Sequence, residues 1–324
     1  MDQLRFVLRR LGHGLATLLL IAIMNFVLIR AAPGDPATVL AGESGAADAQ
    51  LLQQLRQRFD LDRPLPQQLA TYLGHLAHGD LGESYRQQQP VLELIMDRLP
   101  ATLLLTGSAF VLSLLFGVAL GAWASRHAGR WQDNAISTLS MLFYATPLYW
   151  LALMAVLLFS VWLQWLPGFG YEAIGAGFTG WARVRDIAAH LALPALSLAT
   201  VYMAIYARMT RASMLEVAHQ DFVKTARAKG ISEGRILRAH ILRNALLPVI
   251  TLAGMQAGAM VGGAVLIETV FAWPGIGRLL YEALAQRDYA LLLGTFLVTA
   301  AIAVLFNLLT DVVYTLVDPR IELS

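Results

Sequence analysis

Six long apolar stretches dominate this chain and limit what it can fold into. A bilayer core of about 30 Å needs about 20 helical residues at 1.5 Å per residue. Stretches of that length lie at residues 11–29, 101–124, 135–163, 187–207, 245–271 and 291–317. Only 14% of the 324 residues are charged, against about 25% in soluble domains. The sequence therefore predicts an all-α, polytopic membrane protein with six transmembrane helices.

The first stretch follows Arg5, Arg9 and Arg10, so it resembles a signal peptide with a basic start. Its apolar run is longer than that of a usual signal peptide, and Arg30 and Pro33 fit a cleavage site poorly. We therefore interpret residues 1–30 as a cytoplasmic N-terminus and a retained first transmembrane helix.

Basic residues indicate the orientation of the helices. More than half of the 24 Lys and Arg residues lie in the N-terminus, in residues 125–134, in residues 208–244 and in the C-terminal tail. Short loops rich in Lys and Arg face the cytoplasm. We therefore predict that both termini lie inside. The net charge of +2 predicts no general attraction to nucleic acid.

Residues 31–100 form the longest segment between apolar stretches. They begin with a turn sequence at residues 33–36 and show helical spacing of apolar residues over 51–59 and 69–76. We predict a small extracytoplasmic cap that is either a structural lid or a docking surface for a delivery protein. Residues 101–324 would then form a five-helix permease core.

Residues 208–244 are the most unusual part of the chain, with eight basic and three acidic residues. We predict one helix over 214–229, ended by Gly230, and a second helix that Ser232 caps and that runs toward Pro248. His240 and Asn244 would share one face of it with Pro248. Pro248 would mark entry into the fifth span.

Two functions fit this basic loop. It could lie on anionic lipid as a basic surface helix. The small residues Thr225, Ala226 and Ala228 beside Gly230 favour insertion into a groove on a cytoplasmic partner.

Prolines and glycines modify the apolar stretches. Pro147 near the middle of the third stretch predicts a kink. Gly254, Gly258 and Gly262 lie four apart on the fifth, where they would either allow tight helix packing or line a substrate path. A sharp turn at the outer surface is predicted over 273–277.

Glu268 lies just before that turn, close to the membrane edge. An acidic residue there is costly unless it is paired or hydrated, so it is a candidate for a pathway or gate. A local hydrogen bond in the turn is the alternative.

The sequence lacks the residues that several kinds of chemistry require. The chain has no cysteine and no Gly-Lys pair, which excludes thiol chemistry and a phosphate-binding P-loop. If ATP is used, another chain must bind it. His75 and His78 could share a helix face, but no third ligand is evident, so we predict no metal site. No catalytic constellation supports an intramembrane enzyme.

Several motifs together are similar to those of the permeases of dipeptide, oligopeptide and nickel importers, an ATP-binding-cassette family. The resemblance covers essentially the whole chain. It is carried by PGDP at 33–36, GDLG at 79–82, RMTR at 208–211, SMLE at 213–216, DFVKTARAKG at 221–230, HILRNALLP at 240–248, Glu268 with Phe271, WPGIGR at 273–278 and DPRI at 318–321.

The resemblance implies a type I importer permease fold in the bacterial inner membrane. A second homologous permease subunit would complete the pore within the lipid bilayer. Two cytoplasmic ATP-binding subunits would bind ATP and Mg²⁺, and an extracytoplasmic solute-binding protein would deliver cargo. This chain would couple to hydrolysis by alternating access without being an enzyme or holding a cofactor.

The resemblance also assigns residues. The coupling helix would contact an ATP-binding subunit through Thr225, Ala226, Arg227, Ala228, Lys229 and Gly230. Loop support would come from Asp221, Lys224, His240, Arg243, Asn244 and Pro248. Many importer permeases carry Glu-Ala-Ala where this chain has residues 224–226, so positions cannot be transferred from other branches.

Peptides are the expected cargo, with nickel, a metal chelate or a glutathione-like peptide as alternatives. A carrier or channel that works alone on an ion gradient is the alternative of another class. Such proteins often have intramembrane acids and repeats, whereas Asp311 and Glu268 lie near span ends here and no repeat is evident.

Overall fold

The computed structural model describes residues 2–31, 53 and 62–317. Apart from one two-stranded hairpin, the regular elements in these ranges are helices. They are α1 (Asp2–Ala31), α4 (Leu65–Ala77), β1 (Glu83–Ser84), β2 (Gln89–Pro90), α5 (Val91–Arg126), α6 (Trp131–Ala145), α7 (Leu148–Ala155), η1 (Val156–Trp162), α8 (Gly180–Ala218), α9 (Asp221–Ala228), α10 (Glu233–Arg235), η2 (Ile236–Leu242), α11 (Arg243–Val270), α12 (Ile276–Ala285) and α13 (Tyr289–Val317).

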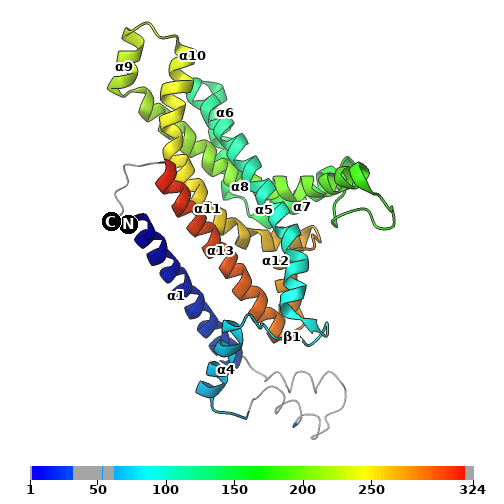
Figure 1. The fold of residues 1–324 in the computed structure, drawn as a ribbon. Helices are drawn as coiled ribbons and strands as arrows, with labels where there is room; N and C mark the ends of the chain where they lie inside the picture. The colour runs from blue at the N-terminus through cyan, green and yellow to red at the C-terminus, as the bar shows by residue number, and fades with distance from the viewer. Residues whose placement is uncertain (1, 32–52, 54–61, 318–324) are drawn as a thin grey trace.

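Five helices in the described ranges are long and apolar enough to cross a membrane. They are Arg9–Leu28, Val91–Arg126, Gly180–Ala218, Glu233–Val270 and Tyr289–Thr310. Five of the six predicted spans are therefore confirmed. In Figure 1 they form an elongated bundle, and the first turn of α1 and the last turn of α13 lie toward the end that carries α9.

The third predicted span is not one kinked helix. Helix α6 ends at Ala145, Pro147 precedes α7, and the α6 and α7–η1 axes differ by 106°. A proline kink normally keeps a helix continuous, whereas here Thr146 and Pro147 have extended ψ angles that end it. Residues 148–162 project sideways from the bundle (Figure 1). Only if the bent pair counts as one span does the number reach six.

The core lies where α5, α7, α8 and α11 meet. Leu105 of α5, Leu198 of α8 and Ile267 of α11 are fully buried there with Trp273 of the following turn. Burying such side chains contributes about 1.5–3 kcal/mol each. Helix α1 is mostly exposed and packs on α13, where a Cβ at Gly14 would lie 2.9 Å from Val304.

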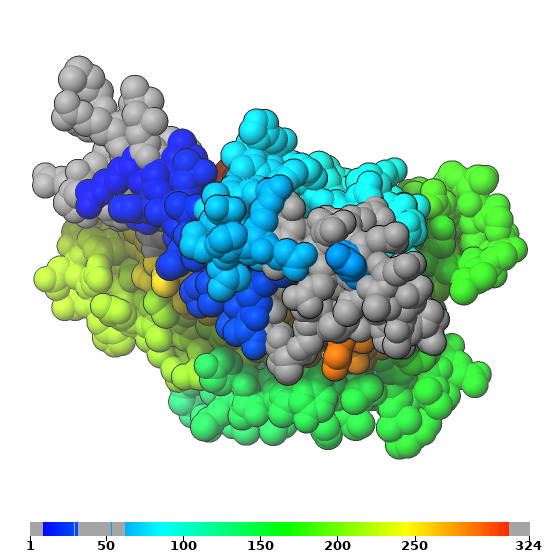
Figure 2. Space-filling model, turned by 90° about the horizontal axis from the view of Figure 1, so that it is seen from below, coloured from blue at the N-terminus to red at the C-terminus, as the bar shows by residue number. Residues whose placement is uncertain are grey.

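The predicted cap is described only in part. Helix α4 confirms the helix expected over 69–76, while residues 33–36 and the helix expected over 51–59 lie outside the described residues, apart from residue 53. Figure 2, from the end opposite α9, shows α4 beside α1. Phe26 of α1 stacks on Tyr72 of α4, with ring centroids 5.8 Å apart. Desolvation raises the pKa of Tyr72 to about 12.

The second predicted span, expected to begin at residue 101, belongs to a helix that begins at Val91 and continues through Pro100. The additional ten residues were missed because only one side of them is apolar and packs on α12 and the start of α13. Val91, Leu94 and Ile95 form an apolar cluster with Ile276 and Leu279.

The two histidines of the cap point to different partners. His75 Nδ1 lies 2.8 Å from Asp80 Oδ2, and His78 Nδ1 lies 2.8 Å from the Gly74 carbonyl oxygen. The Gly82 N–H and His75 lower the pKa of Asp80. His75 therefore holds the turn at residues 78–82, and His78 contacts the backbone of α4.

Candidate functional site

Helix α9 is an eight-residue helix at one end of the bundle (Figure 1). The prediction of one helix over 214–229 is wrong, because α8 ends at Ala218 and α9 begins at Asp221. Asp221 in the first turn and Arg227 in the last turn suit the helix dipole. Gly230 has φ +75°, a left-handed conformation that favours glycine, and its N–H donates to the Arg227 carbonyl over 2.9 Å.

Helix α9 is fastened to the bundle by its inward face. Val223 is fully buried, and Ala226 is 5% exposed. They pack with Met214 of α8 and with Ile236 and Ile241 of η2 in one apolar cluster. Ala226, predicted at the partner contact, therefore faces the chain's own helices. A displacement of α9 must move α8 and η2 with it.

The opposite face of α9 is exposed among the residues that the structure describes. Predicted contact residues that are exposed there are Thr225, Arg227, Ala228, Lys229 and Gly230. Phe222 is 40% exposed beside them. Sequence reasoning missed Phe222 because one aromatic in an eight-residue helix has no periodic signal. Aromatic residues are enriched at protein interfaces, so the exposed Phe222 is a candidate contact.

Two ion pairs order the exposed face. Lys224 Nζ lies 2.8 Å from Asp221 Oδ1, and Arg227 Nε lies 2.9 Å from Glu233 Oε1 across the turn at Gly230. Both pairs are solvent-exposed, so each contributes little to stability. Their effect is to fix where the charges lie.

The second helix of the loop is continuous with the fifth span from Glu233 to Val270. Ser232 occupies the N-cap position, but its side chain makes no capping hydrogen bond. Asn244 Nδ2 donates to the His240 carbonyl over 2.6 Å, while Arg243 is exposed. Pro248 lies inside α11 rather than at its entry. A π-helical segment, Ile236–Leu242, precedes α11 instead.

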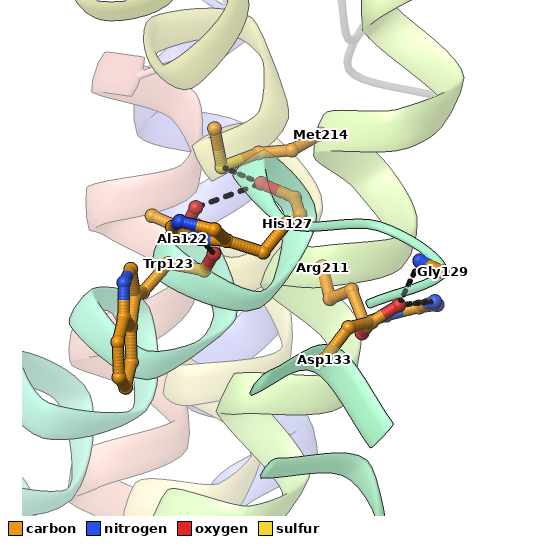
Figure 3. Close-up of polar contacts among 8 residues, drawn as sticks. Ala122, Trp123, His127, Gly129, Asp133, Arg211 and Met214 are labelled. Carbon is orange, nitrogen blue, oxygen red and sulfur yellow. Dashed lines mark hydrogen bonds and ion pairs between the residues drawn. The ribbon is translucent and has the colours of Figure 1, made fainter. Parts of the chain in front are cut away.

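The buried carboxylate of Asp133 holds the turn between α5 and α6 in place (Figure 3). Asp133 of α6 is 1% exposed and accepts from Arg211 Nε and, over 2.7 Å, from Arg211 Nη2 of α8. Its Oδ2 also accepts the Gly129 N–H over 2.9 Å. Arg211 belongs to the motif at 208–211, but Asp133 was missed because the two are 78 positions apart. Asp133 therefore locks the α5–α6 turn to α8.

We expect Asp133→Ala to destabilise the protein by about 1–3 kcal/mol, because it leaves the charged Arg211 without its partner and removes the acceptor of the Gly129 N–H. Thermal unfolding of the purified protein measures this. The double variant with Arg211→Ala should cost less than the sum of the single variants. Lys224→Ala breaks an exposed pair and should change melting little. Equal effects of the two single substitutions Asp133→Ala and Lys224→Ala would contradict this assignment.

The residues predicted to line the pathway have different surroundings in the structure. A Cβ at Gly254 would collide with Thr310 of α13, and one at Gly258 would lie 2.9 Å from Asn307 Oδ1. These two glycines therefore serve helix packing, which was one of the two alternatives. Gly262 is exposed with open space in front of it, so a role in lining a path stays a prediction. Glu268 is fully buried in the last turn of α11, just before the α11–α12 turn.

Comparison with known proteins identifies the family. Residues 117–323 match the family model of the binding-protein-dependent transport system inner membrane component, and residues 3–106 match that of its N-terminal part. The chain is 40% identical over 334 residues to the di/tripeptide transport system permease protein DppB of Pseudomonas aeruginosa, covering 99% of each chain. It is also 40% identical over 316 residues to a Brucella abortus protein named for a peptide transport system permease, covering 98% of each.

A solved structure shows the same fold. The MetNI methionine ABC transporter in an inward-facing conformation matches with a TM-score of 0.56 and 17% identity, over 70% of this chain and 97% of that chain. The predicted all-α polytopic importer fold is therefore confirmed. This chain belongs to the binding-protein-dependent transport system inner membrane components and is a multi-pass transport permease of the bacterial inner membrane.

Proposed function

We propose that this chain forms half of the translocation path of a peptide importer and that α9 inserts into a cleft on a cytoplasmic ATP-binding subunit. The observation that supports this most is the two-faced α9: Val223 and Ala226 face the bundle, and Phe222, Arg227 and Lys229 face outward. A basic helix that only rested on lipid would not need its own apolar anchor. The names of the two relatives support peptide cargo.

The geometry explains how the chain would transmit work. Force applied to α9 passes through the cluster of Met214, Val223 and Ile236 to α8 and to the helical run Glu233–Val270. Both helices enter the central core through Leu198 and Ile267. The ATP-binding subunits would bind ATP and Mg²⁺, and this chain would convert their closure into movement of its helices. A second permease would supply the other wall of the path.

Cargo would arrive from an extracytoplasmic solute-binding protein and be a di- or oligopeptide. Nickel, a metal chelate and a glutathione-like peptide are the alternatives. Within the described residues no group of three His, Cys, Asp or Glu side chains is placed to hold a metal ion. The ligands of a metal cargo would therefore have to come from outside the described residues of this chain.

The test is ATP-driven uptake by the assembled transporter in liposomes, with its solute-binding protein and a labelled tripeptide. Uptake should require ATP, the binding protein and all subunits. Stimulation of ATP hydrolysis by nickel or glutathione in place of the tripeptide would reassign the cargo. Transport by this chain alone on an ion gradient would overturn the proposal in favour of a carrier.

Phe222→Asp should reduce co-purification of the ATP-binding subunits by at least about tenfold, because an exposed aromatic of this kind contributes about 2 kcal/mol or more at a protein interface. Phe222→Leu keeps an apolar side chain and should retain most of the association. The melting temperature of the isolated chain should be similar in both variants. Full association of Phe222→Asp would show that α9 is not the contact.

A further inference from the structure

The turn between α11 and α12, which follows the helical run Glu233–Val270 at its end away from α9, is organised around one carboxyl group. Glu268 Oε1 accepts the hydroxyl of Thr102 on α5 over 2.7 Å, and Oε2 accepts the Arg278 N–H over 3.0 Å. The Thr102 hydroxyl oxygen also accepts the Ile276 N–H over 2.8 Å. Glu268 and Thr102 are 0% and 2% exposed. The carboxyl group therefore joins α5, α11 and α12 away from solvent.

Glycines make room for this carboxyl group. A Cβ at Gly275 would collide with the carboxyl group of Glu268, and a Cβ at Gly277 would lie 2.5 Å from the Cα of Val265. Trp273 is fully buried, and its Nε1 donates to the Ala101 carbonyl over 2.9 Å. The turn expected at the surface is thus packed into the protein, and it is held to α5 at two adjacent residues.

The loop between η1 and α8 contacts the same turn. The Gly170 N–H donates to the Phe271 carbonyl over 2.9 Å, and the ring centroids of Tyr171 and Trp273 lie 4.8 Å apart. The loop is also tied to α8, because the Ala173 N–H donates to Asp186 Oδ2 over 2.7 Å and Arg183 pairs with Glu172. Ile174 and Phe178 beyond these contacts are exposed. The turn that Glu268 holds is therefore the attachment of residues 170–171, while residues 172–173 are attached to α8.

The helical run Glu233–Val270 connects this turn to the other end of the molecule. It is 38 residues long, or about 57 Å at 1.5 Å per residue. Ile236 and Ile241 at one end pack against α9, and Glu268 is the last acidic residue at the other end. The run therefore reaches from the proposed ATPase contact to the loop at residues 163–179.

We propose that Glu268 is a positioning residue rather than a gate in the path. By binding Thr102 and the Arg278 N–H, it makes α5, the α11–α12 turn and residues 163–179 move as one body with α11. Movement that begins at α9 then reaches the outer loop. This last step rests on the proposed function, whereas the positioning of the loop does not.

The test uses the assembled transporter with Thr102→Val or Glu268→Gln, and with Thr102→Ser as the matched control that keeps the hydroxyl. Valine has nearly the shape of threonine but can neither donate to Glu268 nor accept from Ile276. Amide hydrogen exchange should become at least about tenfold faster over 165–173 in Thr102→Val and Glu268→Gln. It should be unchanged in Thr102→Ser, and unchanged over α9 in all three variants.

ATP-driven uptake should fall several-fold in the two disruptive variants while ATP-binding subunits still co-purify. Unchanged exchange over 165–173 in both variants would overturn the positioning role. Faster exchange with full uptake would overturn the transmission from α9 to the loop. If the unmodified complex takes up no peptide, the proposed function fails, and the exchange experiment still decides the role of Glu268.

Discussion

Gly121→Ala will prevent α5 and α8 from packing at their present distance. A Cβ at Gly121 would collide with the carbonyl oxygen of Ala207 and lie 2.7 Å from the Cβ of Thr210. Backbone atoms cannot rotate away as the end of a flexible side chain can, so the helices must separate. Overpacking of this kind costs about 1–3 kcal/mol and occasionally more. We expect the larger values because α5 and α8 form the most extensive helix pair in the described part of the chain.

The melting temperature of the purified protein in detergent measures this cost, and the yield of folded protein should fall with it. Gly107→Ala is the matched control, because Gly107 lies on the same helix and a Cβ there would meet no atom within 4 Å. Alanine there should be neutral or stabilising by up to about 1 kcal/mol. Similar melting of both variants would show that the close contact of the two helices is not needed.

Val223→Asp will detach α9 and abolish uptake. Val223 of α9 is fully buried in the apolar cluster that α9 forms with α8 and η2. A buried unpaired carboxylate costs several kcal/mol, more than the anchor of an eight-residue helix can supply. The transmembrane helices do not depend on this cluster alone, so insertion and most of the thermal stability should persist.

Peptide uptake and hydrogen exchange over 221–230 test this prediction. Val223→Thr serves as the graded control, because threonine has the same shape, carries no charge and can bond a backbone carbonyl of its own helix. It should reduce uptake only partly. Rapid exchange in Val223→Asp together with normal uptake would mean that an ordered α9 is not required for coupling.

The apolar stretches predicted the five long spans because a membrane helix is defined by length and composition, both of which are local. The ends of helices were predicted less well. Helix α12 was missed, since ten residues after a Pro-Gly turn form no membrane span and resemble a loop. The break before Pro147 was predicted as a kink because sequence shows where a proline lies but not whether tertiary contacts keep the helix straight.

The candidate site also contains some features that follow from local sequence and others that depend on contacts between distant residues. The positions of Gly230 and of the basic residues of α9 follow from a local motif. The pairing of Asp133 with Arg211 and of Thr102 with Glu268 joins residues 78 and 166 positions apart. Nothing in one sequence indicates which of many polar residues will meet across two helices. The structure was needed to show that Glu268 faces the protein interior.

The sharp bend between α6 and α7 has a consequence for what surrounds the molecule. Helix α6 has 15 residues, which rise about 22 Å and fall short of the roughly 30 Å of hydrocarbon. Peptide groups at its end, near Ala145, lack their next helical turn. Hydrocarbon chains cannot offer hydrogen bonds to such groups. Acyl chains should therefore be excluded from this flank, which is where water or another polypeptide must meet the protein.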